Sequence, residues 1–280
     1  MSRQFLSKLP PMKEPIKYPT GSTLDLLAKG SFKVPTIMLL GAILQLALTA
    51  ALPLRWAVIP TGVMLLNSVV STFLQLRSPE ANTYLEGVIP GRTTAQLPDA
   101  RGSMGPEPSA GSVVMFQLGV QFNHPLGFVA PGSAEVSAMF TRMNDELNAA
   151  REEHGFLGSS TWRAFDRDSN NTLLNTYFFK DVQSVNRFAQ METHTKAWQM
   201  YNALPDKAHI GIFHETYIVP ANGYESLYVN CRPLLMGQGQ VKCDTEDGER
   251  WVSTLVSSNT PKLKTHYTRL GRDHLGNIKG

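Results

Sequence analysis

The sequence is poor in charge and in cysteine, and neither charge sign is in large excess. Charged residues make up 18% of the 280 residues, against roughly 25% in an average soluble protein. A formal charge of +3 is too small for a protein that binds nucleic acid by neutralising phosphates. The two cysteines, Cys231 and Cys243, can build neither a disulfide framework nor a four-cysteine zinc site. We expect free thiols in a reducing compartment, and no nucleic-acid partner.

Common catalytic and cofactor-binding motifs are also missing. The chain has no glycine-rich phosphate loop, no GxSxG elbow, no HExxH and no CxxC. The GQGQ at Gly237 lacks the strand-to-helix context of a dinucleotide site. Nothing in the sequence marks a flavin or nicotinamide site, and we predict no metal ligands.

Two long hydrophobic runs follow the first 35 residues. Residues 36–54 and 56–76 contain no charged side chain, and only Arg55 separates them. Each run is close to the ~20 residues that a helix needs to cross the hydrocarbon core of a bilayer. A cleaved signal peptide fits poorly, because its apolar region would be shorter and nearer the start. We predict a transmembrane helical hairpin; a hairpin buried in a soluble core and a shallow hairpin that never crosses are the alternatives.

Basic residues gather at the two outer ends of this predicted hairpin. Those before it are Arg3, Lys8, Lys13, Lys17, Lys29 and Lys33, and those after it are Arg77, Arg92 and Arg101. The positive-inside rule then places both chain ends in the cytosol. We expect a protein of the endoplasmic reticulum membrane whose catalytic domain faces the cytosol, with no glycan on the sequon at Asn170.

Residues 77–111 are rich in Pro, Gly, Ser and Thr and poor in large apolar residues, which predicts a linker. An alternation of strands and helices follows it. Strands are predicted over 112–122, from 157, from 171 and over 209–219, with a short one at 224–230; helices are predicted over 133–155 and, in two pieces, over 181–201. Ser133 is the candidate N-cap of the first helix, the second begins near Asp181, and Asp168–Asn170 suits a hairpin turn.

The order strand, helix, strand, strand, helix, strand is that of the ferredoxin-like fold, of the α+β class. We place this domain at 112–235, behind a cytosolic N-terminal arm at 1–35. A C-terminal extension, 236–280, ends in a basic tail that is solvated or touches anionic headgroups.

One face of such a sheet carries no helices and needs a cover. Phe213, Tyr217 and Val219 lie on this face of the fourth strand by the two-residue period. A second copy of the domain would bury them. We therefore predict a homodimer.

Polar residues within apolar segments are the candidate catalytic groups. His214 alternates with isoleucines on the strand face that should meet the helices. Asn175 and Tyr177 share one face of the third strand, while His194 and Trp198 are four residues apart and so share a helix face. We predict that these side chains line one pocket between sheet and helices. Such a pocket would supply a general base, from His214 or as second choice from His194, and hydrogen-bond donors from Asn175 and Tyr177.

Four further side chains are predicted to contact the substrate. They are Trp198, Trp162, Tyr217 and Glu215. Each prediction has a structural alternative: a hydrogen-bonded core imidazole for His214, ordinary packing for the helical pair His194 and Trp198, and an ion pair at the dimer face for Glu215.

The segment 211–230 resembles a family of fungal and bacterial monooxygenase-like proteins that includes the polyketide monooxygenase of the fumagillin pathway. This family is related to the antibiotic-biosynthesis monooxygenases. Its G-I-W-H-E-T-Y strand is matched with Phe213 in place of Trp, and its P-x-G-x-Y-E-x-x-Y-x-N segment is matched by Pro220 to Asn230 with one residue inserted. Val113 to Gly119 and the spacing of His194 and Trp198 match as well, so the resemblance covers about 112–240.

The resemblance implies a dimeric ferredoxin-like monooxygenase that needs no metal or flavin and uses molecular oxygen as co-substrate. Its substrate would be a lipophilic polyketide or terpenoid intermediate, oxidised by a membrane-anchored enzyme. The alternatives are a cyclase, dehydratase or haem enzyme, with His214 or His194 as axial ligand, and a non-enzymatic membrane scaffold. One departure stands out: the family's Tyr-Trp-Arg-Ser is Tyr177-Phe178-Phe179-Lys180 here, which implies a different substrate or reaction if that Arg contacts an anionic substrate.

Overall fold

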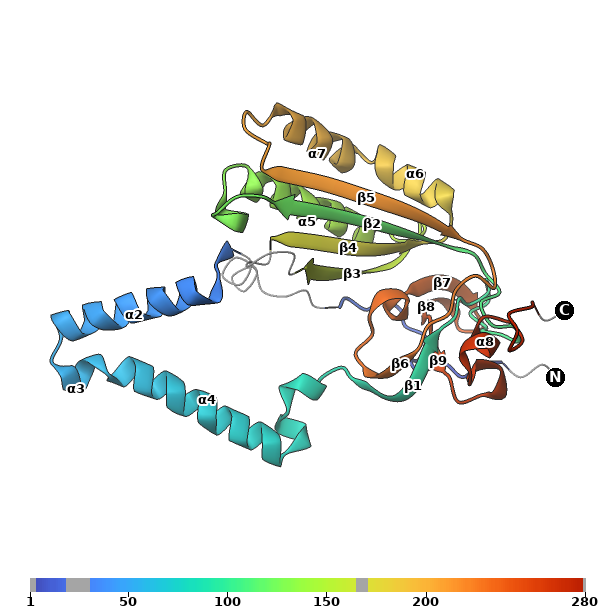
Figure 1. The fold of residues 1–280 in the computed structure, drawn as a ribbon. Coiled ribbons are helices and arrows are strands. Elements are labelled where there is room, and N and C mark those ends of the chain that lie inside the picture. Colours follow the sequence, from blue (N-terminus) through green and yellow to red (C-terminus); the bar gives the residue numbers. More distant parts are fainter. Residues whose placement is uncertain (1–3, 19–30, 165–170, 279–280) are drawn as a thin grey trace. The chain divides into compact units, whose positions relative to one another are not determined.

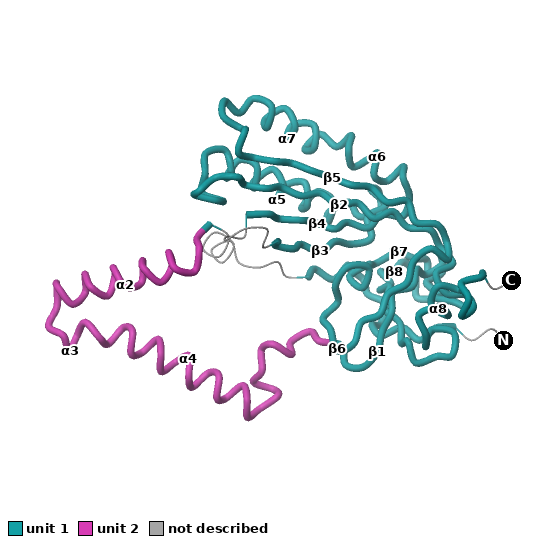
Figure 2. Tube along the Cα trace, in the orientation of Figure 1, with its two compact units in different colours: residues 1–31, 89–280 teal, residues 32–88 magenta. Residues whose placement is uncertain are grey.

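The chain forms two compact units, one inserted into the sequence of the other (Figure 2). The structure is a computed structural model, which describes residues 4–18, 31–164 and 171–278. Unit 2 is Phe32–Val88, and unit 1 combines Met1–Ser31 with Ile89–Gly280. The predicted turn at Asp168–Asn170 lies outside the described residues.

Unit 2 is a pair of apolar helices. It contains α2 (Val34–Ala51), a short α3 (Leu54–Ala57) and α4 (Ile59–Arg77), followed by two 3-10 turns, Pro79–Ala81 and Thr83–Leu85. Of the residues of α2 and α4, all of which are described, none is buried. The spans Val34–Ala51 and Leu54–Arg77 are each long and apolar enough to cross a membrane. The predicted pair of apolar helices is therefore present.

Hydrogen bonds join the two helices of unit 2 beside their connection. The Gln45 side chain donates to the Ala57 carbonyl over 3.2 Å, and its oxygen accepts from Thr61 over 2.6 Å. An amide in an apolar helix is satisfied in this way without water.

Unit 1 contains the predicted ferredoxin-like sheet (Figure 1). Strands β2 (Val113–Phe122), β3 (Phe156–Ala164), β4 (Thr172–Phe179) and β5 (Ile210–Val219) form an antiparallel sheet in the order β3-β4-β2-β5. Helices α5 (Ser133–Ala149), α6 (Val182–Gln190) and α7 (Glu192–Ala203) cover one face. The α+β class and the element order are confirmed.

The helix ends follow from local chemistry. The helix α6 begins next to Asp181, as predicted, and Asp181 is its N-cap, since its carboxylate accepts from the Ser184 amide over 2.7 Å. The two-piece helix is also confirmed, because Met191 adopts extended geometry (ψ 143°) between α6 and α7. The prediction that Ser133 is an N-cap is wrong: the cap is Gly132, whose left-handed φ of 78° turns the chain into α5, and Ser133 is the first helical residue.

The stretches predicted as linker and extension form a second sheet. Strand β1 (Ile89–Ala95) lies between β6 (Tyr228–Cys231) and β9 (Leu255–Ser257), while β7 (Gln240–Thr245) and β8 (Gly248–Ser253) form a hairpin. Short 3-10 turns η3 (Gly127–Val129), η4 (Leu235–Gln238) and η5 (Pro261–Leu263), and α8 (His266–Arg269), complete the unit. The prediction of an unstructured linker at 77–111 is therefore wrong for β1. The residues Thr93, Thr94 and Ala95 are buried in this strand although they are small.

The N-terminal arm pairs with both β9 and β8. Its backbone pairs with Leu255 through Lys8, with Ser257 through Leu6, and in both directions with Trp251 through Met12. Phe5 is buried in the adjoining core. The arm is therefore a strap across unit 1 rather than an independent segment.

The sheet face without helices is only partly open. Leu157 and Phe178 on this face pack against Tyr228 and Met236. The Leu235 amide in η4 donates to Ser160 of β3 over 2.7 Å. The rest of the face carries Trp162, Phe213 and Tyr217, which are 40%, 43% and 44% exposed.

Candidate active site

An apolar pocket lies between the helices and the sheet of unit 1. Strands β2 and β5 form its floor, and α5 and α7 form its walls. Its lining residues are Leu118, Val136, Met139, Phe140, Met143, His194, Ala197, Trp198, Met200, Tyr201 and Ile212. The free volume is about 50 Å³, little more than the share of one water in the liquid. A larger ligand must displace the side chains around it.

His194 is the lining residue that can act as a base near neutral pH. It lies in the first turns of α7, half-buried, with its ring 5.3 Å from that of Phe188. Burial lowers its pKa, and the nearby His214 lowers it further, while a hydrogen bond to the Ala189 carbonyl opposes the shift. The neutral imidazole is therefore favoured at pH 7, which is the form that accepts a proton.

Trp198 lies one helical turn after His194 and also lines the pocket, as the spacing predicted. Its ring stacks on Tyr201 with centroids 5.7 Å apart. The Tyr201 hydroxyl donates to the Ile210 carbonyl over 2.8 Å, which holds α7 to β5. Trp198 is 55% exposed, so this aromatic pair forms the outer wall.

His214 points to the helix-covered side but is not buried. It pairs with Leu118 of β2, and its ring lies 5.7 Å from that of Phe116. Its side chain is exposed and is not among the pocket-lining residues. The expectation of a desolvated imidazole is wrong because β5 is an edge strand whose outer residues, Ile218 among them, face solvent.

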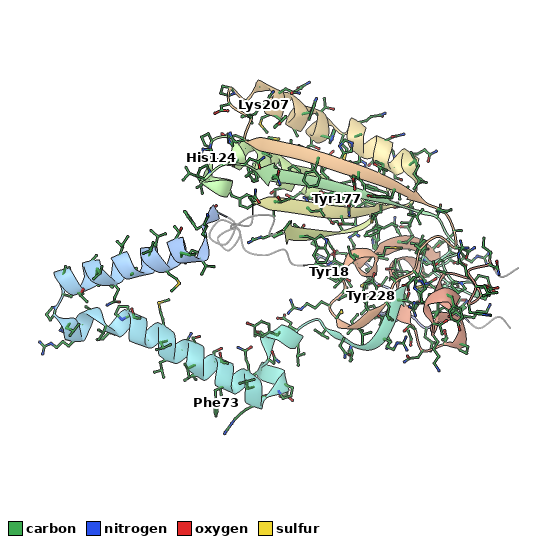
Figure 3. The ribbon with its side chains drawn as sticks, in the orientation of Figure 1. Tyr18, Phe73, His124, Tyr177, Lys207 and Tyr228 are labelled. Carbon is green, nitrogen blue, oxygen red and sulfur yellow. The ribbon has the colours of Figure 1, made fainter. Side chains whose placement is uncertain are left out.

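Asn175 and Tyr177 belong to a separate polar cluster. Tyr177 donates to Asn144 of α5 over 2.9 Å, and Thr161 donates to Asn175 over 2.6 Å. Burial raises the pKa of Tyr177, against the effect of its hydrogen bonds, so its hydroxyl remains a donor. Figure 3 shows Tyr177 on the four-stranded sheet, within the core. The prediction that Asn175 and Tyr177 line the pocket is therefore wrong. Their partner Asn144 had not been identified from the sequence.

The other predicted substrate contacts lie on the opposite sheet face. Trp162 pairs with Leu174, and Glu215 pairs with Gln117, so their side chains point away from the helices. Glu215 accepts a hydrogen bond of 2.5 Å from Tyr217. These three residues cannot contact a ligand in the pocket. The pocket methionines and Tyr201 were not predicted as site residues, because apolar residues at helical spacing indicate core packing and nothing more.

A second hollow of about 300 Å³ lies near β7. Residues 97–100 and Leu157, Lys180, Val241 and Lys242 line it, and none of the predicted site residues does. Among residues 4–18, 31–164 and 171–278, no three His, Cys, Asp or Glu side chains are grouped so as to hold a metal ion. The pocket beneath α7 is the candidate active site because it alone of the two contains a predicted base.

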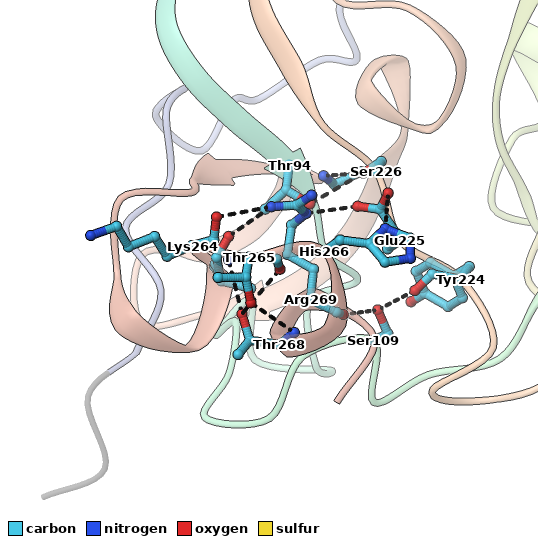
Figure 4. Close-up of polar contacts among 12 residues, drawn as sticks. Thr94, Ser109, Tyr224, Glu225, Ser226, Lys264, Thr265, His266, Thr268 and Arg269 are labelled. Carbon is cyan, nitrogen blue, oxygen red and sulfur yellow. Dashed lines mark hydrogen bonds and ion pairs between the residues drawn. The ribbon is translucent and has the colours of Figure 1, made fainter. Parts of the chain in front are cut away.

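The sequence motif at 220–230 has a structural role (Figure 4). Glu225 accepts from Arg269 of α8 over 2.7 Å and is 2.9 Å from His266. Ser226 accepts from the Ala95 amide over 2.8 Å, and Tyr228 accepts from the Gly237 amide over 3.1 Å. The motif therefore fixes the second sheet and α8. The basic tail is folded here, since Arg269 is only 3% exposed.

Replacing Glu225 with alanine is expected to destabilise unit 1 by about 3 kcal/mol, because Arg269 would be left buried without its carboxylate. The melting temperature should fall by roughly 6–12 °C. His266→Ala is the matched control: its side chain is 69% exposed, so a loss below about 1 kcal/mol is expected. Equal melting of both variants and the parent would contradict a structural role for the pair.

The structure explains where the residues lie that replace the family's Tyr-Trp-Arg-Ser segment. Phe179 is fully buried among Phe156, Tyr177 and Phe188, and Phe178 faces the second sheet. A charged side chain at position 179 would lie in this apolar core. No cation at that position can therefore reach a ligand.

A ferredoxin-like sheet with an apolar pocket under its helices is a scaffold for small-molecule enzymes of several kinds. The sequence profile described as Monooxygenase af470-like matches residues 113–236. Over 275 residues the chain is 45% identical to "Monooxygenase af470" of Aspergillus fumigatus (strain ATCC MYA-4609 / CBS 101355 / FGSC A1100 / Af293), covering 98% of this chain and 100% of that protein. The chain belongs to the Monooxygenase af470-like family and is an oxidoreductase of the monooxygenase type, as the resemblance implied.

Solved structures show more distant similarity. SnoaB, a cofactor-independent oxygenase from Streptomyces nogalater, is 20% identical, covers 38% of this chain and 90% of its own, and has a TM-score of 0.28. An aldoxime dehydratase, OxdRE, is 15% identical with a TM-score of 0.40, over 52% of this chain and 39% of its own.

Proposed function

We propose that this protein is a membrane-anchored monooxygenase that oxidises a lipophilic secondary-metabolite intermediate, a polyketide or a terpenoid, without a bound cofactor. The observation that carries the proposal is the position of His194. It presents a neutral imidazole to a pocket whose other walls are almost entirely hydrocarbon. A base in such surroundings can deprotonate an apolar substrate at an acidified C–H or O–H group.

The reaction balances with oxygen as the co-substrate. His194 accepts a proton from a CH₂ group next to a carbonyl, and the resulting enolate gives one electron to O₂. The substrate radical and superoxide combine into a peroxide anion, which takes the proton back from His194 and becomes a hydroperoxide. Loss of water leaves a new carbonyl group, so one oxygen atom enters the product and the other enters water.

Isotope labelling tests this scheme. Purified full-length protein with ¹⁸O₂ and no added reductant should incorporate one labelled atom per product and release the other as labelled water. The substrate would first be identified as the metabolite that accumulates when the protein is absent from its source cell. A strict requirement for a nicotinamide or flavin reductant would contradict the cofactor-free scheme.

The apolar helices of unit 2 are proposed to cross the endoplasmic reticulum membrane. At 1.5 Å per residue, the 18 residues of α2 and the 19 of α4 are roughly 27–29 Å long, which matches a bilayer core. Arg55 and Trp56 at the connection suit the far headgroup region. With the basic residues at the outer ends, unit 1 faces the cytosol. A glycan on the Asn170 sequon would contradict this orientation.

The open part of the sheet is proposed to bind a second copy of unit 1. A stable interface buries roughly 1,200 Å² or more. Phe213 lies flat over Gly119, where an added Cβ would be 2.1 Å from the ring, so the surface there is smooth and apolar. This face offers an aromatic surface of the kind found at interface centres.

Replacing Phe213 with glutamate is therefore expected to convert a dimer to a monomer, because a charge would be buried without a partner. Light scattering of the full-length protein in detergent, corrected for the micelle, measures the mass. Leu126→Glu is the control, since Leu126 is exposed in the loop before α5 and off this face. A parent protein that is monomeric at high micromolar concentration would contradict the proposal.

A further inference from the structure

We propose that the pocket beneath α7 takes an uncharged ligand and rejects any ligand that carries a carboxylate or phosphate into it. The inference rests on the proposed function and deepens it by naming the substrate class. Its basis is the absence of any fixed charge among the residues that line the pocket, which are all described.

Two hydroxyl groups at the pocket are already bonded to the protein. The Tyr201 hydroxyl donates to the Ile210 carbonyl. The Thr193 hydroxyl, next to His194 in sequence, donates to Glu146 over 2.5 Å. What the pocket offers a ligand is therefore methionine, aliphatic and aromatic surface with two uncharged polar groups, the His194 imidazole and the Trp198 indole.

The charged groups on and beside these elements do not line the pocket. Lys196 of α7 pairs with Glu192 in an exposed i,i+4 bridge. Lys207, beyond the end of α7, donates to the Asn202 carbonyl over 2.8 Å and lies over the Tyr201 ring. Arg142 of α5 is exposed and does not line the pocket. A ligand anion would thus lose its hydration without gaining an ion pair, which strongly weakens binding.

The methionines indicate the shape of the ligand. Met139, Met143 and Met200 contribute three flexible thioether side chains to a pocket of about 50 Å³. Such side chains adapt to irregular hydrocarbon surfaces. A skeleton of branched or cyclic hydrocarbon with one activated carbon beside His194 fits this lining.

The chemical class places the reaction in a sequence. The step that supplies the substrate must already have removed any charged carrier. A cyclisation that expels diphosphate does this, as does thioester cleavage followed by loss of CO₂. The oxidised product is neutral too, so a later enzyme must add any charged group.

Photolabelling of the full-length protein in lipid nanodiscs tests the proposal without turnover. Two probes of equal chain length carry the same alkyl diazirine; one ends in a methyl ketone and the other in a carboxylate. Labelling of pocket residues is divided by labelling of α2 and α4, which corrects for the local concentration of each probe. We expect the ketone to label α5 and α7 at the pocket at least about tenfold more than the carboxylate.

A variant pair sharpens the test. Met139 is half-buried in the pocket wall, so Met139→Lys should raise carboxylate labelling while Met139→Leu should not. The melting curve of each variant confirms that it is folded. Equal labelling by both probes, or carboxylate labelling that disappears in Arg142→Gln, would overturn the proposal, as would no pocket labelling by either. Pocket labelling by the ketone without any ¹⁸O incorporation would leave the inference standing and contradict the proposed function.

Discussion

Replacing His194 with glutamine is expected to lower turnover by about 10²–10⁴-fold while the protein stays folded, because glutamine fills similar space but cannot accept the substrate proton. His194 is half-buried in a helix that has no fully buried residue, so its loss should cost little stability. Turnover and a melting curve are measured on the same preparation. A variant that melts early yet turns over normally per folded molecule would show that His194 is only a packing residue.

The pH profile separates His194 from its neighbour. Because the pKa of His194 is lowered, the neutral base persists below the ordinary histidine range, and the rate should fall as pH drops through that lowered pKa. His214→Gln removes the repulsive charge and should move this acid limb to higher pH, with a much smaller loss of rate at pH 8. A 100-fold loss in His214→Gln with the limb unmoved would make His214 the base instead.

Replacing residues 32–88 with a flexible Gly/Ser linker is expected to give a soluble and folded unit 1. The division of the chain at Phe32 and Val88 leaves the arm and β1 in place on either side of the replacement. A linker of about 20 residues spans roughly 25 Å on average, which allows the flanking segments to keep their own contacts. Solubility without detergent and a cooperative melt are the measurements.

A chain that lacks residues 1–76 is the informative comparison. Like the linker variant, it lacks the hairpin. Unlike that variant, it also lacks the N-terminal strap, with buried Phe5 and the paired backbone of Met12. Removing a buried phenylalanine alone costs about 3–5 kcal/mol, a large share of a typical domain's stability. We expect this shorter chain to aggregate. Equal melting temperatures of the two shortened proteins would show that the arm contributes nothing.

The ferredoxin-like part of the fold was predictable because its signals are local. The strand Val113–Phe122 lies within one residue of the predicted 112–122, since a large apolar residue occupies every second position from Val114 to Phe122. Asp181 marks the start of α6, because an N-cap bonds to a backbone amide only three residues later in the chain. The length and the lack of charge of the two hydrophobic runs predict the apolar helices of unit 2.

The second sheet was not predictable by the same means. Strand β1 is stabilised by pairing with β6 and β9, which lie more than 130 residues further along the chain. Its buried residues are Thr93, Thr94 and Ala95, which carry too little apolar surface to indicate burial. Long-range pairing of small residues leaves no periodic signal in the sequence.

The candidate site was predicted in its chemistry but not in its grouping. Strand register correctly puts His214, Asn175 and Tyr177 on the helix side of the sheet. It does not say where a helix lies across that face. Tyr177 bonds to Asn144 on α5, whereas His194 meets the pocket formed with α7. The positions of α5 and α7 depend on tertiary packing, so only the structure could separate the two groups.

The break at Met191 affects how a ligand enters. None of the twelve residues of α7, all described, is buried, although this helix covers the pocket. Segments with few buried contacts open at a small fraction of the global unfolding free energy. The amide protons of α7 should therefore exchange with solvent deuterium well before those of β2 and β4. A local opening of this one helix would widen the pocket while the sheet beneath stays intact.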